Sequence, residues 1–283
     1  MITLDQLTAC LAGVERASPG AESPRSTWTA GTLGLAGGHV FGGQMIGQTV
    51  VLGARLHPDK TVKSVSVVFP RGARDTGSLE YTADALHAGS AYATTRVDVA
   101  QPGRDGLPVV GFSAHLMHHA TAEGVEHHRP MPDAGDPDDA RPVELGLVPW
   151  ETRIIGTTDL DDRRPQPAEL TMWMRVGAKL PDDAALHQAM LAFASELTLI
   201  GTALLPHDGW SQLDAHVAMR TSVLAHHVQF HRPFRLDDWL LVSQTGDVAS
   251  GGSAFGSGHV FTADGDLVVS FQQESMTRVA ASS

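Results

Sequence analysis

Hydrophobic and polar positions alternate with period two over several segments of the chain, while two longer segments carry a helical spacing. The stretch KSVSVVF (residues 63–69) alternates in the way of a half-buried strand. Residues 77–100 and 107–119 continue the alternation, with turn residues between the runs. Gly43–Leu56 has the apolar spacing of a helix and closes on His-Pro. With a strand near residues 26–35, the first half is predicted to be a strand, a helix and an antiparallel meander.

The second half repeats this order. Residues 184–205 are apolar nearly all round, which predicts one long buried helix. Asp182 or Asp183 is suited to cap its N-terminus. Strands are predicted on both sides of this helix, in residues 149–156, 170–180, 223–230, 237–262 and 266–278.

The two halves also share a local pattern. VVFPRGARDTGSLEY (residues 67–81) and FHRPFRLDDWLL (residues 230–241) both lead from a strand ending in Phe, through an arginine turn, to a second apolar strand. Such an internal echo indicates that one unit was duplicated. We therefore predict an α+β protein of two tandem units, each an antiparallel sheet wrapped around a long central helix. The units are expected over residues 1–118 and 147–283.

Residues 119–146 are rich in Pro, Asp, Gly and His, which is typical of a linker between the units. The pairs His118-His119 and His127-His128 lie at or in this stretch, but no zinc-type spacing accompanies them. We therefore predict no metal site.

Composition narrows the range of functions. The chain has 283 residues and a formal net charge of -12, which argues against nucleic acid and anionic membrane surfaces as partners. No apolar run is long enough to cross a bilayer, and the N-terminus reads as a short amphipathic helix rather than a signal peptide. Cys10 is the only cysteine, so intramolecular disulfides and thiolate metal clusters are excluded. A cytoplasmic protein is expected.

Two polar residues in apolar surroundings are candidates for chemistry. Glu196 falls in the middle of the most apolar predicted helix, where an unpaired carboxylate is costly and burial would raise its pKa towards that of a general base. Gln273 shares a face with Val269, Phe271 and Ser275 if the last strand alternates with period two. A core-facing glutamine offers a donor and an acceptor to a water molecule, or it bonds a backbone carbonyl.

Four segments together resemble the acyl-CoA thioesterase II family: VFGGQMIGQTV, LPDDAALHQAMLAFASELTLIGTALLPH, FHRPFRLDDWLL and DGDLVVSFQQESM. The resemblance runs in order over nearly the whole chain. It implies a double hotdog fold and a place in lipid metabolism. It also implies hydrolysis of acyl-CoA to free acid and CoA by an activated water, with no cofactor, metal or covalent acyl-enzyme. A homo-oligomer is expected as well.

In the family, a carboxylate on the second helix, a hydroxyl on the next strand and a glutamine on the last strand position the water. Glu196 stands at the carboxylate position, where the family has Asp, and Gln273 matches the glutamine. The hydroxyl position is Val223, which leaves Ser222 and Thr221 as the nearby hydroxyls. Ser222 becomes the candidate if a β-bulge re-aims it. The neighbouring family histidine is kept as His226, which is expected with Val223 to line the substrate site.

Gly42, Gly43 and Gln44 open the first predicted helix. Free backbone N–H groups and the helix dipole there would suit a thioester oxygen. Equally, the glycines would allow close packing against a sheet. The stretch lacks the lysine of a phosphate loop, and no Gly-x-Ser-x-Gly elbow occurs in the chain.

Three functions compete on these residues. The first is an acyl-CoA thioesterase, slowed by the missing hydroxyl at Val223 and the longer side chain of Glu196. The second is a weakened protein that binds acyl thioesters without efficient turnover. The third is a dehydratase or hydratase, for which the chain lacks an Asp-x-Asn-Pro-x-His segment. We rank them in that order.

Overall fold

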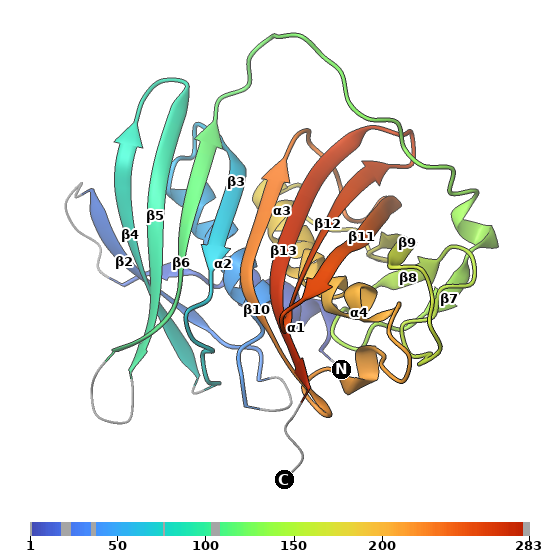
Figure 1. Cartoon of the computed structure of the whole chain (residues 1–283). Helices are drawn as coiled ribbons and strands as arrows, with labels where there is room; N and C mark the ends of the chain where they lie inside the picture. The colour runs from blue at the N-terminus through green and yellow to red at the C-terminus, as the bar shows by residue number, and fades with distance from the viewer. Residues whose placement is uncertain (1, 18–23, 35–37, 76, 103–107, 280–283) are drawn as a thin grey trace. The chain divides into compact units, whose positions relative to one another are not determined.

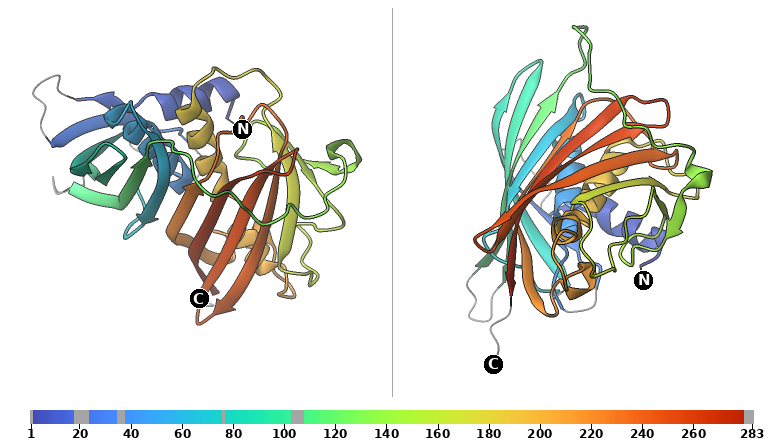
Figure 2. Two further views of the ribbon diagram at one scale, coloured as in Figure 1. Left: turned by 90° about the horizontal axis from the view of Figure 1, so that it is seen from above. Right: turned by 45° about the vertical axis from the view of Figure 1, so that its right-hand side comes forward.

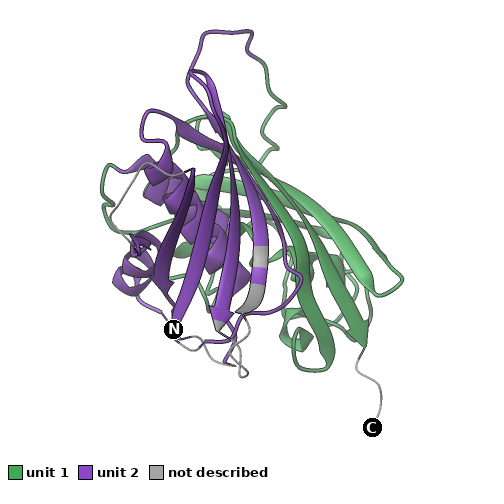
Figure 3. Ribbon diagram, turned by 90° about the vertical axis from the view of Figure 1, so that its left-hand side faces the viewer, with its two compact units in different colours: residues 1, 127–182, 195–283 green, residues 2–126, 183–194 purple. Residues whose placement is uncertain are grey.

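A computed structural model describes residues 2–17, 24–34, 38–75, 77–102 and 108–279. The chain separates into two compact units, coloured differently in Figure 3. The first unit contains Ile2–Glu126 together with Asp183–Ala194, and the second contains His127–Asp182 and Ser195–Ser283. Each unit is described separately below.

The first unit is an antiparallel sheet with helices packed on it (Figure 1). Its strands are hydrogen-bonded in the order β1-β2-β4-β5-β6-β3. The predicted first helix and the N-terminal amphipathic helix are both present. The elements are α1 (Leu4–Ala12), β1 (Glu15–Arg16), β2 (Arg25–Gly31), α2 (Gly42–Leu56), β3 (Thr61–Val68), β4 (Ser78–Ala88), β5 (Tyr92–Pro102) and β6 (Pro108–His119).

Helix α3 (Ala184–Ser195) packs, up to Ala194, within this same unit. Asp183 caps it, because its Oδ1 accepts hydrogen bonds from the backbone N–H groups of Ala185 and Leu186 at 3.0 and 3.3 Å. Gln188 Nε2 donates to the carbonyl of Val62 in β3 at 3.0 Å. Helix α2 approaches so closely that a Cβ on Gly47 would lie 2.8 Å from the Ala189 carbonyl oxygen. Glycine is therefore required there for close packing between helices.

The second unit is a longer antiparallel sheet, hydrogen-bonded in the order β10-β13-β12-β11-β9-β8-β7. Strands β10 to β13 form a twisted, curved surface (Figure 2). The elements are η1 (Pro137–Asp139), β7 (Arg141–Val143), β8 (Glu151–Ile154), β9 (Glu169–Arg175), α4 (Leu199–Leu204), η2 (Gln212–Asp214), β10 (Met219–Phe230), β11 (Leu240–Ser250), β12 (Ser253–Thr262) and β13 (Leu267–Val279).

The second predicted helix is not continuous, which corrects the expectation of one helix over residues 184–205. It breaks between Ser195 and Leu199, and α4 packs chiefly on β11 and β12. Gln244 of β11 secures the break, accepting a hydrogen bond from Thr198 Oγ1 at 3.1 Å and donating one to Thr202 Oγ1 at 2.6 Å. These buried side-chain bonds anchor α4 at the break, and apolar periodicity does not report them.

The two ends of the predicted linker differ in how they are packed. Strand β6 extends to His119, and residues 120–136 lie outside helices and strands. From His127 onwards, however, the segment belongs to the second unit. Trp173 Nε1 donates to the Ala134 carbonyl at 3.4 Å, and β7 pairs with β8. The C-terminal part of the predicted linker is thus packed against the second sheet.

The turn after β10 has an architectural role. Arg232 Nη1 donates to the Leu267 carbonyl at 3.2 Å. Asp237 accepts from the Arg235 guanidinium at 2.9 and 3.1 Å, from the Leu180 N–H at 3.1 Å, and pairs with Lys179 at 3.1 Å. The hydrogen bonds from Arg235 are the main reason that the pKa of Asp237 is held well below its usual range. This web of charge-assisted bonds ties the turn to the segment before α3.

Candidate active site

A β-bulge in the ladder of β10 and β13 positions the site. Val223 pairs with Ser275 and His226 pairs with Gln273, with the register shifting between Val223 and Ala225. Directly opposed residues of an antiparallel pair share a face of the sheet. The extra residue therefore lets Val223 and His226, three positions apart, both point to the face that carries Gln273 and Ser275.

A chain of side-chain hydrogen bonds crosses this face. The distance from Ser195 Oγ to His226 Nε2 is 2.8 Å, and that from His226 Nδ1 to Gln273 Oε1 is 3.0 Å. Gln273 Nε2 then donates to Ser275 Oγ at 2.9 Å. All four residues are buried, with 6, 2, 1 and 3% of their surface exposed. The prediction that Gln273 and Ser275 face inwards is confirmed, and Gln272 and Glu274 are exposed on the opposite face.

The hydrogen bonds define the protonation of His226. Gln273 Oε1 is an acceptor only, so Nδ1 of the ring carries the proton and donates it. Burial lowers the pKa of His226 to about 3, so the ring is neutral at ordinary pH. A neutral ring protonated at Nδ1 accepts at Nε2, and the Ser195 hydroxyl is its donor there.

Glu196 lies at the break between α3 and α4 and is 6% exposed. Glu196 directly follows Ser195 in the sequence. It is therefore the next residue after the one that begins the series of side-chain hydrogen bonds. The helix break places this residue on a turn rather than inside a continuous helix. Glu196 is thus a buried carboxylate that adjoins this set of hydrogen-bonded residues in sequence, and buried titratable groups cluster at reactive sites.

Ser222 does not join these residues. It pairs with Met276, is exposed, and its Oγ donates to the Val223 carbonyl at 3.3 Å. The bulge follows Val223, so it turns His226 inwards and leaves Ser222 on the opposite face. The neighbouring Thr221 is buried, but its hydroxyl accepts from the His216 backbone N–H at 3.1 Å. The expectation that a bulge would bring Ser222 into the site is therefore corrected.

Gly42, Gly43 and Gln44 belong to the first unit and start α2 there. The Gln44 amide is occupied locally: its Nε2 donates to the Gly31 carbonyl at 3.1 Å and its Oε1 accepts from the Leu33 N–H at 3.1 Å. The side chain thus holds the helix start to the end of β2 and to the segment that follows it. A substrate role for these three residues stays a prediction.

Ser195 is the residue that sequence reasoning missed. Its position directly before the buried carboxylate in AFASELT was the available signal. The internal repeat, which matches Phe69 with Phe230 and Phe112 with Phe271, equates Val65 with His226 and Ala114 with Gln273. Val65 and Ala114 are both buried and apolar. The polar site therefore has no counterpart at those positions of the first unit.

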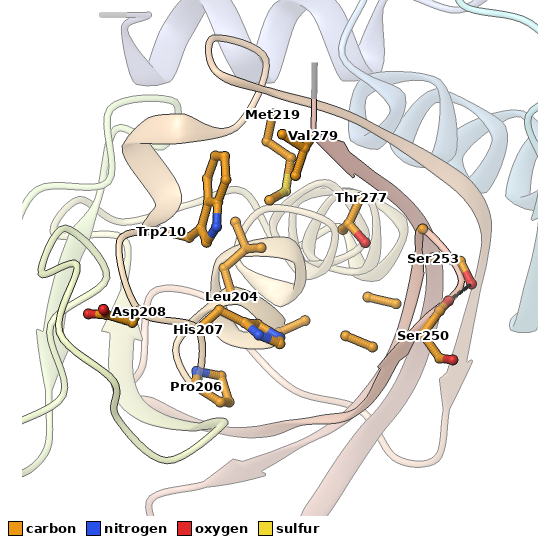
Figure 4. A pocket seen from close by; sticks show the side chains of 14 residues that line it. Leu204, Pro206, His207, Asp208, Trp210, Met219, Ser250, Ser253, Thr277 and Val279 are labelled. Atoms are coloured by element: carbon orange, nitrogen blue, oxygen red, sulfur yellow. Dashed lines mark hydrogen bonds between the residues drawn. The ribbon is translucent and has the colours of Figure 1, made fainter. Parts of the chain in front are cut away.

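A cavity of about 440 Å³ opens at the end of α4, on the face of β13 that also carries Gln273. Trp210 and His207, from the segment after α4, lie across it from Ser250 and Ser253 of the β11–β12 hairpin (Figure 4). Thr277, four residues beyond Gln273, also lines it. None of the predicted site residues does.

Two further classes of site receive no support from the described residues. Within that part of the chain, no group of three or more His, Cys, Asp or Glu side chains is arranged to hold a metal ion. None of the described helices combines the length and apolarity needed to pass through a lipid bilayer.

Comparison with known proteins identifies the class to which this fold and site belong. The family model for acyl-CoA thioesterase matches residues 166–276, and that for the acyl-CoA thioesterase N-terminal domain matches residues 29–119. The crystal structure of an acyl-CoA thioesterase II, TesB2, from Mycobacterium marinum is 28% identical. It superposes with a TM-score of 0.79 and covers 97% of this chain and 99% of that chain.

Curated relatives of this chain are also acyl-CoA thioesterases. "Acyl-CoA thioesterase 2" of Haemophilus influenzae is 26% identical over 84% of this chain and 87% of its own length. "Acyl-coenzyme A thioesterase 8" of Homo sapiens is 26% identical over 85% of this chain and 81% of its own length. The fold is a double hotdog, as predicted. The chain belongs to the acyl-CoA thioesterase family, a family of thioester hydrolases.

Proposed function

We propose that this chain hydrolyses acyl-CoA thioesters by direct attack of water, with Glu196 as the general base and Gln273 orienting the water. The observation that carries the mechanism is the buried chain Ser195–His226–Gln273–Ser275, which ends one residue from the buried carboxylate of Glu196. Family membership supports the substrate class.

The reaction balances with these groups alone. Glu196 accepts a proton from water as the water oxygen adds to the thioester carbonyl carbon. The tetrahedral intermediate then collapses, the C–S bond breaks, and the CoA sulfur takes the proton from Glu196. The products are the free acid and CoA. Gln273 has a remaining amide hydrogen and a remaining lone pair, which suit a water that must donate and accept at once.

The oxyanion needs hydrogen-bond donors. That backbone N–H groups at Gly42 and Gly43 serve as such donors stays a prediction, based on the first turn of a helix having N–H groups without intrahelical partners. Val223 and His226 face Gln273 on the same side of the ladder and would line the bound thioester. A cytoplasmic location and a homo-oligomeric state remain predictions.

A second candidate is a protein that binds acyl-CoA and turns it over poorly. Val223 favours this candidate, since its side chain cannot replace the family hydroxyl opposite Ser275. The buried Glu196 and Gln273 oppose it, because a binding site for an apolar chain has no need of a buried carboxylate.

Turnover of acyl-CoA substrates of graded chain length, followed by release of the CoA thiol, tests the proposal. We expect hydrolysis that depends on enzyme concentration and is slow for this class of enzyme. Acyl-CoA binding measured by calorimetry at every chain length, without thiol release, would reject the proposal and leave the binding protein.

Restoring the hydroxyl gives a directional prediction. We expect Val223→Thr to raise kcat by roughly tenfold, because Thr has nearly the volume of Val and its hydroxyl would lie across from Ser275 on the site face. Ser222→Ala, which alters the exposed neighbour, is expected to leave kcat unchanged. Steady-state kinetics on both variants distinguish the two positions; a loss confined to Ser222→Ala would contradict the assignment.

A further inference from the structure

We propose that Ser195 and His226 are positioning residues, which hold the amide of Gln273 in the one orientation that serves the attacking water. This inference rests on the proposed thioesterase function. It adds a role for Ser195, and it assigns His226 a task beyond lining the bound thioester, one that involves no proton transfer to the reacting atoms.

The donor and acceptor order of the chain carries the inference. Ser195 donates to Nε2 of His226, Nδ1–H donates to Oε1 of Gln273, and Nε2 of Gln273 donates to Ser275. Each link is between 2.8 and 3.0 Å. A neutral imidazole donates at one ring nitrogen and accepts at the other. If donor and acceptor exchange roles in one of these hydrogen bonds, they must therefore exchange roles in all of them. The chain therefore has two complete polarities and no mixed one.

Only one polarity presents the amide as proposed. If His226 were protonated at Nε2 instead, its Nδ1 would need a donor, and the Gln273 amide would rotate by half a turn. The remaining lone pair and the remaining N–H of Gln273 would then exchange places. A water oriented by both would be turned away from its productive geometry. In the observed polarity Ser195 fills the acceptor position at Nε2 of His226, which would otherwise be buried without a donor.

The same geometry resembles the serine–histidine pair of a covalent hydrolase, which is the alternative to be tested. Two observations oppose it. His226 is buried, and burial lowers its pKa and keeps the ring neutral, so it is a poor acceptor for the serine proton. The third member is an uncharged amide, which does not stabilise an imidazolium as a carboxylate does.

Ser195→Ala, His226→Leu and His226→Asn test the role by kinetics. We expect Ser195→Ala to lower kcat about tenfold and His226→Leu about a hundredfold, with KM within twofold, because misplacement by about 1 Å costs that much. His226→Asn, whose amide N–H can replace Nδ1–H, should recover to within about tenfold of the parent chain. Equal losses for Asn and Leu would reject the positioning role.

The chain offers a matched control at the end of the same ladder, where the residue after β10 bonds to β13. His231 Nε2 and Ser270 Oγ are 2.9 Å apart, a histidine–serine bond between the end of β10 and β13 that does not reach Gln273. Ser270→Ala removes a comparable bond and is expected to leave kcat unchanged. If Ser270→Ala and Ser195→Ala lower kcat by similar factors, both hydrogen bonds merely stabilise the ladder of β10 and β13, and the positioning role is rejected.

A spectroscopic readout separates this inference from the proposed function. We expect ¹⁵N NMR of histidine-labelled full-length protein to show His226 neutral and protonated at Nδ1 between pH 5 and pH 8, and to lose this single tautomer in Ser195→Ala. Protonation at Nε2 in the parent chain would overturn the inference, whatever the turnover. An acyl group found on Ser195 by mass spectrometry during turnover would also overturn it. Absence of turnover with the expected tautomer would instead reject the thioesterase function alone.

Discussion

Glu196→Gln is expected to lower kcat on acyl-CoA by a factor of about 100 to 10,000, the range that a positioned general base contributes. The substitution keeps the size of a side chain that is 6% exposed and removes its ability to accept a proton. Ligand binding and thermal unfolding should change little, because no methylene is lost from the packed helix break. The measurement is kcat from CoA release, together with binding by calorimetry.

Glu274→Gln is the matched control for this variant. Glu274 is an exposed carboxylate on β13, next to Gln273 but on the opposite face of the sheet. The same chemical change there is expected to leave kcat within twofold of the parent chain. If turnover of the purified protein proves indifferent to Glu196→Gln, Glu196 is not the base, and the binding protein becomes the better description.

Stability is expected to fall steeply between pH 7 and pH 5, by about 4 kcal/mol in the free energy of unfolding. Two buried histidines make the largest contributions. Burial lowers the pKa of His118 to about 4 and that of His226 to about 3, from 6.5 for an unperturbed side chain. Below pH 6.5 these two histidines are therefore protonated in the unfolded chain but remain neutral in the folded chain. Stability is complete above that pH and is lost as the pH falls towards the folded pKa values.

The surroundings of both rings account for the shifts. His118 lies 4.6 Å from the ring of His57, between centroids, and neither of its ring nitrogens has a hydrogen-bond partner among the described residues. Lys60 lowers its pKa further, while Asp59 acts weakly in the opposite direction. For His226, the hydrogen bond to Gln273 raises the pKa but does not offset the burial.

Urea unfolding of the parent chain and of His118→Phe at pH 7, 6 and 5 checks this prediction. The variant removes one titrating group and should lose about half of the pH-dependent change, roughly 2 kcal/mol. The measured quantity is the change of the free energy of unfolding with pH. Any pH-independent destabilisation from fitting the larger phenylalanine ring does not affect this change. A free energy of unfolding that is flat over this range would contradict the buried, neutral histidines.

Local patterns in the sequence were sufficient for much of the architecture. The period-two alternation in β13 predicted that Gln273 and Ser275 face inwards, since strand geometry sends alternate side chains to opposite faces. The helical spacing predicted α2, and the duplicated order of elements predicted two similar sheets. These features depend on residues that are near one another in the sequence, so the sequence pattern is enough to predict them.

The details that make the site were decided by tertiary contacts. The bulge at Val223 and Ala225 turns His226 rather than Ser222 towards Gln273, and strand alternation alone cannot locate such an extra residue. The helix break at Glu196 is secured by Gln244, a residue 46 positions from Thr198. Ser195 gains its partner from a strand 31 residues away. Hydrogen bonds between distant segments form only once the sheet has closed on the helix, so their geometry is a property of the folded packing and leaves no periodic trace in the sequence.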